Sequence, residues 1–167
     1  FAISSSARSS CIRTRCSGPI AAKAGIRDEL VRSPAVRELA IVGGENDGSI
    51  TLIDIAKRML GARIQLPLES TQQPRPRGVA VSRDGKLAYV TTGRAGSVVV
   101  IDLDKRAVAK TIENVGKRPW GIAVGADGRL YTANGPSDDI SVIDPVAGRV
   151  VRRIHTGGSP WTVVLAA

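Results

Sequence analysis

Short runs of apolar residues, separated by turn sequences, fill most of this chain. Two of them, residues 98–101 and 140–143, are almost purely aliphatic, and each ends next to an aspartate. Runs of this length and composition predict β-strands that are buried on both faces. Residues 110–113 and 151–154 instead mix polar and apolar positions, which predicts strands with one exposed face. The pattern therefore predicts an all-β chain.

The strands and turns repeat with a period close to forty residues. Pro76 and Pro119 are 43 positions apart, Pro160 follows 41 positions later, and Asp102 and Asp144 are separated by 42. Two complete repeats predict four strands each, at residues 77–82, 86–92, 97–103 and 107–113, and at residues 120–125, 129–134, 139–144 and 149–155. An earlier repeat predicts strands at 39–42, 49–54 and 62–66, and a last strand is expected at 161–165. Four antiparallel strands in about forty residues are typical of a β-propeller blade.

The repeats divide the chain into a leader and about three blades. We expect residues 1–38 to form a non-repeat leader, disordered or with a short helix over 19–31. The propeller repeats are expected at 39–167, as a partial blade at 39–75, full blades at 76–118 and 119–159, and the first strand of a next blade at 160–167. Closed propellers take roughly four to eight blades, so the sequence predicts a partial propeller or a fragment. Further blades, or two or more copies of the chain, would complete a ring; an open stack with exposed edges is the third alternative.

The composition limits the classes of partner and cofactor that we expect for this chain. The net charge of +9, from 24 Lys and Arg against 15 Asp and Glu, is spread along the chain. A diffuse excess indicates a solvated basic surface, so no nucleic-acid partner is expected. Cys11 and Cys16 with a single histidine are too few for a zinc site, and we expect no metal and no other cofactor; free thiols and a disulfide are both open. No apolar run approaches the roughly twenty residues that span a bilayer.

Residue types that recur at one position in every repeat are expected to be structural. Asp54, Asp102 and Asp144 each end a buried strand, where a carboxylate can accept hydrogen bonds from turn amides. The Asp-Gly pairs at 84–85 and 127–128 predict hairpin turns. A catalytic carboxylate is the alternative for the three strand-end aspartates, but acid–base chemistry needs one placed pair rather than a periodic series. No catalytic residue is therefore expected.

The residues that open each blade differ between repeats. Tryptophans follow Pro119 and Pro160, whereas an arginine follows Pro76, and Arg75 and Lys117 lie in the same loops. Aromatic and guanidinium groups on one face of a propeller can stack on a ligand, and the cations would form a rim for an anionic ligand; packing between blades is the alternative. The candidate ligand-binding residues are Arg77, Arg118, Trp120 and Trp161.

Two other features are expected to be structural. His155 lies at the end of the outermost strand of its repeat and has no assignable acidic or hydroxyl partner, which favours a surface histidine. The acidic loop at 134–139 matches no established calcium-loop spacing, so a turn is expected there.

These phrases resemble the YVTN-family β-propeller repeat, in which Pro-x-Gly, Asp-Gly-Lys, Tyr-Val-Thr-Asn and Ile-Asp follow one another. The second repeat matches at Pro76, Gly78, 84–86, 89–92 and 101–102, and the third at Pro119, Gly121, 127–129, 131–134 and 143–144. The third repeat is most similar to bacterial periplasmic members, some of them associated with quinoprotein-dependent alcohol catabolism. The resemblance implies a periplasmic or extracellular location.

Together these observations favour an exported, non-catalytic propeller module for binding or scaffolding. Its partner would be a protein or a small anionic ligand on one propeller face. The alternative is part of a redox-associated propeller that binds or serves a haem or quinone cofactor enzyme. A propeller hydrolase or lactonase is the third possibility, and it would need several acidic residues converging on the axis with a metal. The fold alone does not decide among them.

Overall fold

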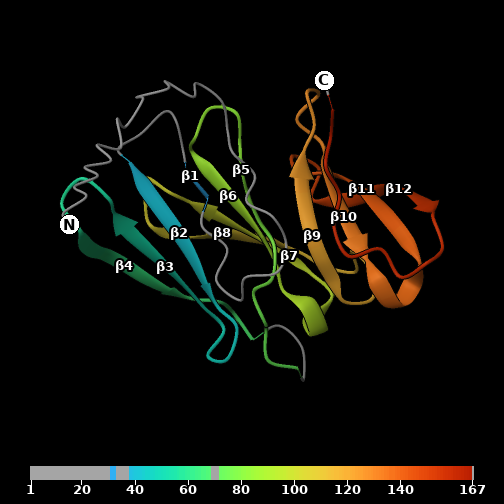
Figure 1. Ribbon diagram of the computed structural model, residues 1–167, viewed down its shortest axis with the longest axis horizontal. Coiled ribbons are helices and arrows are strands. Elements are labelled where there is room, and N and C mark those ends of the chain that lie inside the picture. The colour runs from blue at the N-terminus through green and yellow to red at the C-terminus, as the bar shows by residue number, and fades with distance from the viewer. Residues whose placement is uncertain (1–30, 33–37, 69–71, 167) are drawn as a thin grey trace, which may run out of the picture.

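The computed structural model describes residues 31–32, 38–68 and 72–166, which form three four-stranded antiparallel sheets arranged side by side (Figure 1). The first sheet contains β1 (Val31–Arg32), β2 (Leu39–Gly44), β3 (Ser49–Asp54) and β4 (Met59–Gln65). The second contains β5 (Val79–Val81), β6 (Leu87–Thr91), β7 (Val98–Asp102) and β8 (Ala107–Ile112). The third contains β9 (Pro119–Val124), β10 (Leu130–Asn134), β11 (Asp139–Asp144) and β12 (Arg149–His155).

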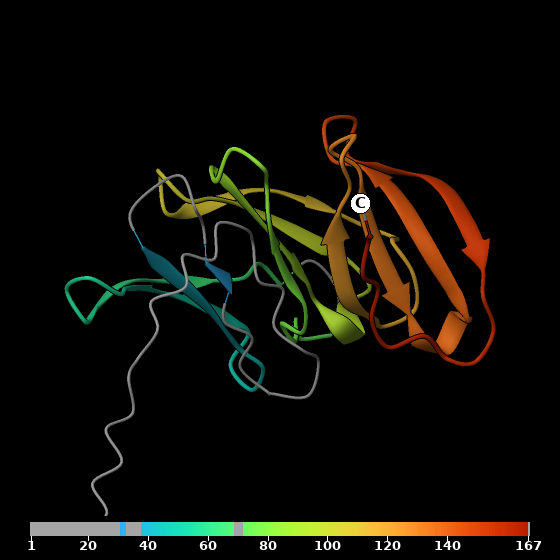
Figure 2. The same ribbon diagram turned by 45° about the horizontal axis from the view of Figure 1, so that its top comes forward.

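Each sheet keeps its strands in chain order, and the first strands of the sheets face one another. β5 packs against both β1 and β9, so the three sheets are arranged as consecutive blades around a common inner edge (Figure 2). This confirms the all-β fold class and the partial propeller. Within the described residues the helices are two 3-10 turns, η1 (Gly93–Ala95) and η2 (Gly135–Ser137). Neither is long and apolar enough to cross a membrane.

The hydrophobic core lies between the blades, in two layers that meet at β7. Val99 and Ile101 pack into the cluster shared with the first blade, whereas Val98 and Val100 pack into the cluster shared with the third. All four side chains are at most 2% exposed. Because successive side chains of a strand point to opposite faces, a strand with a neighbour on each side must be apolar at every position. The uninterrupted run at 98–101 has this cause.

The structure corrects the predicted ends of the propeller. Residues 31–32, which were expected in a leader, form β1 and pair with Ile41 and Ala40 of β2, so the first blade has four strands. Apart from residue 31, which belongs to β1, the short helix predicted over 19–31 lies outside the described residues. The strand predicted at 161–165 is wrong, because residues 156–166 form no strand. A strand requires a ladder of hydrogen bonds to a neighbouring strand. This segment lies beside β9 but forms no such ladder, and no second strand of the described residues lies on its other side.

The recurring aspartates have the structural role that the repeat predicts. Asp102 Oδ1 accepts hydrogen bonds from the backbone N–H groups of Asp104 and Lys105 at 3.1 and 2.9 Å. Asp144 Oδ1 accepts from Val146 and Ala147 at 2.8 and 2.9 Å, and Asp54 accepts from one turn amide in the same way. These amide hydrogen bonds stabilise the ionised carboxylates, so they lower the pKa of Asp102 and of Asp144 below the usual value.

We expect the free energy of unfolding to fall as the pH is lowered below about 4. The carboxyls of Asp102 and Asp144 have lower pKa values in the folded chain than in the unfolded chain. Their contribution is therefore complete above the unfolded pKa and is lost as the pH falls through the folded pKa. Urea unfolding at several pH values measures this loss.

The double variant Asp102→Asn/Asp144→Asn should show a smaller loss of stability with acid than the wild type. Asparagine keeps a side-chain oxygen that accepts the turn amides but carries no titrating charge. Asp104→Asn is the matched control, since in the described part of the chain no hydrogen bond to its carboxylate is found. An unchanged pH dependence in the double variant would assign the acid sensitivity to other groups.

Candidate functional site

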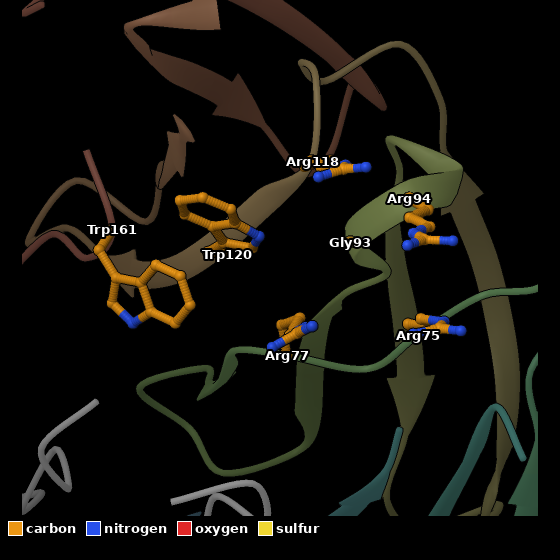
Figure 3. Close-up of a pocket in the computed structure, with 7 residues that line it drawn as sticks. All are labelled: Arg75, Arg77, Gly93, Arg94, Arg118, Trp120 and Trp161. Atoms are coloured by element: carbon orange, nitrogen blue, oxygen red, sulfur yellow. The ribbon is translucent and has the colours of Figure 1, made fainter. Parts of the chain in front are cut away.

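The loops that open the second and third blades surround a pocket of about 170 Å³ at one end of the inner edge (Figure 3). It brings together the four residues that the sequence predicted as ligand-binding. The lining also includes two further arginines and a glycine, so that it consists of Arg75, Arg77, Gly93, Arg94, Arg118, Trp120 and Trp161. The pocket thus combines four guanidinium groups with two indole rings.

The two tryptophans form one wall of the pocket. The ring centroids of Trp120 and Trp161 are 4.2 Å apart, with an interplanar angle of 43°. Trp120 lies directly over Gly135, where a Cβ would stand only 2.8 Å from Cε3 of the indole. Trp161 keeps 48% of its surface exposed. The glycine therefore provides the space that holds Trp120 against Trp161, and Trp161 presents a free aromatic surface.

The repeat explains how the pocket is built. Glu45, Gly93 and Gly135 occupy equivalent positions, one or two residues after the end of the second strand of their blades. In the second and third blades, a glycine here makes room for the residue that follows the blade-opening proline: Arg77 lies beside Gly93, and Trp120 covers Gly135. In the first blade, the glutamate at this position reaches the arginines of the next blade instead.

Glu45 neutralises one side of the arginine cluster. Its Oε1 accepts a hydrogen bond from Arg77 Nη2 at 2.7 Å and lies 3.6 Å from Arg75 Nη1. The carboxylate is mostly buried, with 16% of its side chain exposed. For Arg94 and Arg118, no ion pair is found among the described residues. The pocket therefore keeps a net positive charge on the side of these two exposed arginines.

Arg118 has a backbone conformation that arginine rarely adopts. Its φ is +50°, in the left-handed region, where a side chain other than that of glycine or asparagine costs free energy. The conformation brings the guanidinium group into the lining of the pocket, as Figure 3 shows. Strain of this kind is often found where a side chain has a functional position.

Other candidates from the sequence lie elsewhere. Lys117 is exposed and does not line the pocket; its backbone N–H donates to Ser137 Oγ at 3.4 Å. His155 is exposed at the end of β12. Arg94 was not predicted, because it follows a recurring glycine in a segment that resembles an ordinary turn. Its only signal in the sequence is that a proline occupies the same position in the third blade.

The acidic loop after β10 serves a buried hydrogen-bond network. Asn134 is fully buried, and its Nδ2 donates to Asp139 Oδ1 at 2.6 Å and to Ser141 Oγ at 2.9 Å. Its Oδ1 accepts from Thr132 Oγ1 at 3.2 Å. Across the described residues, no group of three His, Cys, Asp or Glu side chains is placed to hold a metal ion.

A family model places the chain among known proteins. The model described as "SMP-30/Gluconolactonase/LRE-like region" matches residues 42–166. The resemblance to the YVTN family receives no separate support and stays a prediction. No curated protein sequence gives a significant match.

Solved structures agree on the fold. Hydrazine synthase from Kuenenia stuttgartiensis superposes with a TM-score of 0.65 at 26% identity, over 73% of this chain and 34% of that one. Apo AztD from Citrobacter koseri superposes with a TM-score of 0.63 at 22% identity, over 80% of this chain and 37% of that one. The chain thus spans about a third of the length of the solved chains that it matches.

Proposed function

Because the chain belongs to the SMP-30/gluconolactonase/LRE-like family of β-propellers, we propose that its blades form a non-catalytic module that binds a small anionic ligand. The observation that carries this proposal is the pocket itself. Four arginines from three loops meet two tryptophans there, and Glu45 is the acidic residue that pairs with the cluster. The module would act outside the cytoplasm, as the resemblance to periplasmic propellers implies.

The lining indicates the chemistry of the ligand. Guanidinium groups recognise carboxylates and phosphates through paired, charge-assisted hydrogen bonds. Arg94 and Arg118 have no ion pair in the described part of the chain and are the groups available for this contact. The exposed surface of Trp161 favours a flat, unsaturated body next to the anionic group. An aromatic or heteroaromatic carboxylate satisfies both requirements.

Lactone hydrolysis, which the family description suggests, fits the described residues less well. A metal-assisted hydrolase needs several carboxylates or imidazoles that converge on one ion. In the part of the chain that the structure describes, no such group of three is found, and the acidic residue nearest the pocket lining, Glu45, is held by two arginines. We therefore derive no hydrolytic step for these blades.

The match to hydrazine synthase supports a second candidate, a propeller that binds or serves a haem or quinone enzyme. A haem in these blades would need an axial ligand near the pocket. The chain has one histidine, His155, and it lies at the end of the outermost strand of its blade. A soluble quinone carboxylate, by contrast, would be one member of the ligand class proposed above.

Intrinsic fluorescence tests the binding proposal, because Trp120 and Trp161 are the only tryptophans of the chain. We expect benzoate to quench this fluorescence in a saturable way, and cyclohexanecarboxylate, which has the same charge but no π-system, to bind more weakly. In Arg118→Gly the affinity for benzoate should fall about tenfold through the loss of one charge-assisted contact. Glycine is the right replacement, since it adopts the positive φ without strain.

Two further variants complete the experiment. Lys117→Ala removes the neighbouring charge outside the pocket and should leave the affinity unchanged. Gly135→Ala should weaken binding, because the new methyl group displaces Trp120 from its place against Trp161. Wild-type fluorescence that does not respond to millimolar benzoate, or an equal loss in the Lys117 variant, would contradict the proposal.

A further inference from the structure

Two of the four pocket arginines already hold a carboxylate. Glu45 Oε1 accepts a hydrogen bond from Arg77 Nη2 at 2.7 Å and lies 3.6 Å from Arg75 Nη1. Glu45 belongs to the turn between β2 and β3, whereas both arginines belong to the loop that leads into β5. Guanidinium groups that face a carboxylate in this way are also what proteins use to bind the acidic groups of ligands. Here the protein itself supplies the carboxylate.

The backbone fixes the two arginines independently of Glu45. The N–H of Arg75 donates to the carbonyl of Thr92 at 2.9 Å. The N–H of Arg77 donates to the carbonyl of Thr91 at 3.0 Å. Both bonds attach the loop to the end of β6, and both arginine side chains line the pocket. The two guanidinium groups would therefore stay at the pocket if the carboxylate of Glu45 lost its charge.

The other two arginines of the pocket carry no such partner. Arg94 belongs to η1 and Arg118 to the loop before β9, and both residues are exposed. Within the described residues, no ion pair is found for either. Figure 3 shows both guanidinium groups at the pocket. The pocket thus contains two pairs of guanidinium groups, and one of the pairs is occupied by an internal carboxylate.

The repeat indicates that the fold does not require a glutamate here. The equivalent positions of the second and third blades are Gly93 and Gly135, which make room for a side chain of the pocket. Only the first of the three described blades places an acidic residue at this position. A residue that departs from the repeat and contacts the pocket lining has a task other than architecture.

We propose that Arg75 and Arg77 form a second anion subsite that Glu45 masks, so that Glu45 makes the pocket selective for ligands with a single acidic group. This inference rests on the proposed binding of an aromatic carboxylate. A dicarboxylate would bring its second acidic group to cations that are already paired, and close to the like charge of Glu45. Selectivity of this kind comes from rejecting the wrong ligand.

Partial burial makes the masking effective. The side chain of Glu45 is 16% exposed, and those of Arg75 and Arg77 are 39% and 33% exposed. Charges with limited access to water are screened less than charges on an open surface. A ligand that displaced the carboxylate of Glu45 would leave it unpaired in a mostly buried position, and this cost offsets the new contact.

Calorimetric titration with benzoate and with the isomeric phthalate, isophthalate and terephthalate tests the masked subsite. These isomers differ in the spacing of their two carboxylates. In the wild type, none should bind more than about threefold tighter than benzoate. In Glu45→Gln, at least one should bind about tenfold tighter than benzoate or more, because its second carboxylate gains charge-assisted hydrogen bonds. Glutamine keeps an oxygen that accepts from Arg77, and near-ultraviolet circular dichroism checks the fold.

Asp47→Asn is the matched control. It removes the same charge from the same turn, but Asp47 pairs with Arg63 and not with an arginine of the pocket. Its preference between benzoate and the dicarboxylates should equal that of the wild type, which separates masking from a general rise in positive potential. Adding Arg77→Gln to Glu45→Gln should abolish the new preference for a dicarboxylate.

The outcomes separate this inference from the proposed function. If the wild type binds benzoate, but Glu45→Gln changes the affinities for benzoate and for every dicarboxylate in the same proportion, the masked subsite is overturned and the proposed function stands. A wild type that already prefers a dicarboxylate tenfold overturns the subsite as well. A wild type that does not bind benzoate contradicts the proposed function, and the subsite then stands or falls with dicarboxylate binding by Glu45→Gln.

Discussion

Gly78→Ala is expected to lower the free energy of unfolding by about 3 kcal/mol, as overpacking at a close backbone contact does. Gly78 precedes β5 at the inner edge of the second blade, where a Cβ would collide with the carbonyl oxygen of Trp120 and lie 3.2 Å from Gly121 Cα. Both neighbours are backbone atoms, so they cannot yield by a change of rotamer. The second and third blades would have to separate at their inner edges. Urea denaturation followed by circular dichroism measures the change.

Gly61→Ala is the control for the alanine substitution itself. Gly61 also lies in a sheet, on β4, but its nearest contact to a new Cβ is a carbonyl oxygen at 3.3 Å. A small effect at Gly61 and a large one at Gly78 would assign the loss to the inter-blade contact. Equal effects at both positions would show that inner-edge packing is looser than the structure indicates.

Asn134→Leu should also destabilise the chain by about 3 kcal/mol, because it removes three side-chain hydrogen bonds from a buried network and takes away the acceptor of the buried Thr132 hydroxyl. The side-chain amide of Asn134 connects Thr132 of its own strand to Ser141 of the next and to Asp139 at the start of that strand. Leucine has a similar volume but cannot donate or accept. The loss therefore reports hydrogen bonding rather than a cavity, and thermal unfolding of the purified variant measures it.

A second substitution at the same position separates chemistry from size. Thr92 is the equivalent residue of the second blade, and its hydroxyl contacts Ser97 Oγ at 2.8 Å. Asn134→Thr should thus cost less than Asn134→Leu, since a threonine already performs this role in the neighbouring blade. If threonine proved as damaging as leucine, the network would depend on the amide group and could not be exchanged between blades.

The strands of the second and third blades could be predicted because their signals are local. Apolar runs and Asp-Gly turns repeat in the sequence, and the observed bounds of β11 and β12 are the predicted ones. The two ends of the fold depend on partners far away in the chain. β1 has two residues and exists because β2 offers an edge, whereas residues 161–165 have strand-forming residues but no strand to pair with.

The pocket was partly predictable for a related reason. Arg77, Trp120 and Trp161 share one position in the repeat and differ in chemistry, so they were recognisable as residues that the fold alone does not require. The role of Glu45 was not recognisable, because it pairs with arginines of the following blade. Arg94 was not recognisable either, because it follows a glycine that recurs in the repeat and therefore looked like part of a structural turn.

The two-sided packing of β7 couples the blades mechanically. Its odd-numbered side chains belong to one inter-blade layer and its even-numbered ones to the other, so the middle blade cannot loosen without weakening both layers at once. Either outer blade can open by giving up a single layer. Local unfolding should therefore begin at the ends of the row and reach the middle sheet last, as nearest-neighbour coupling implies for stacked repeats.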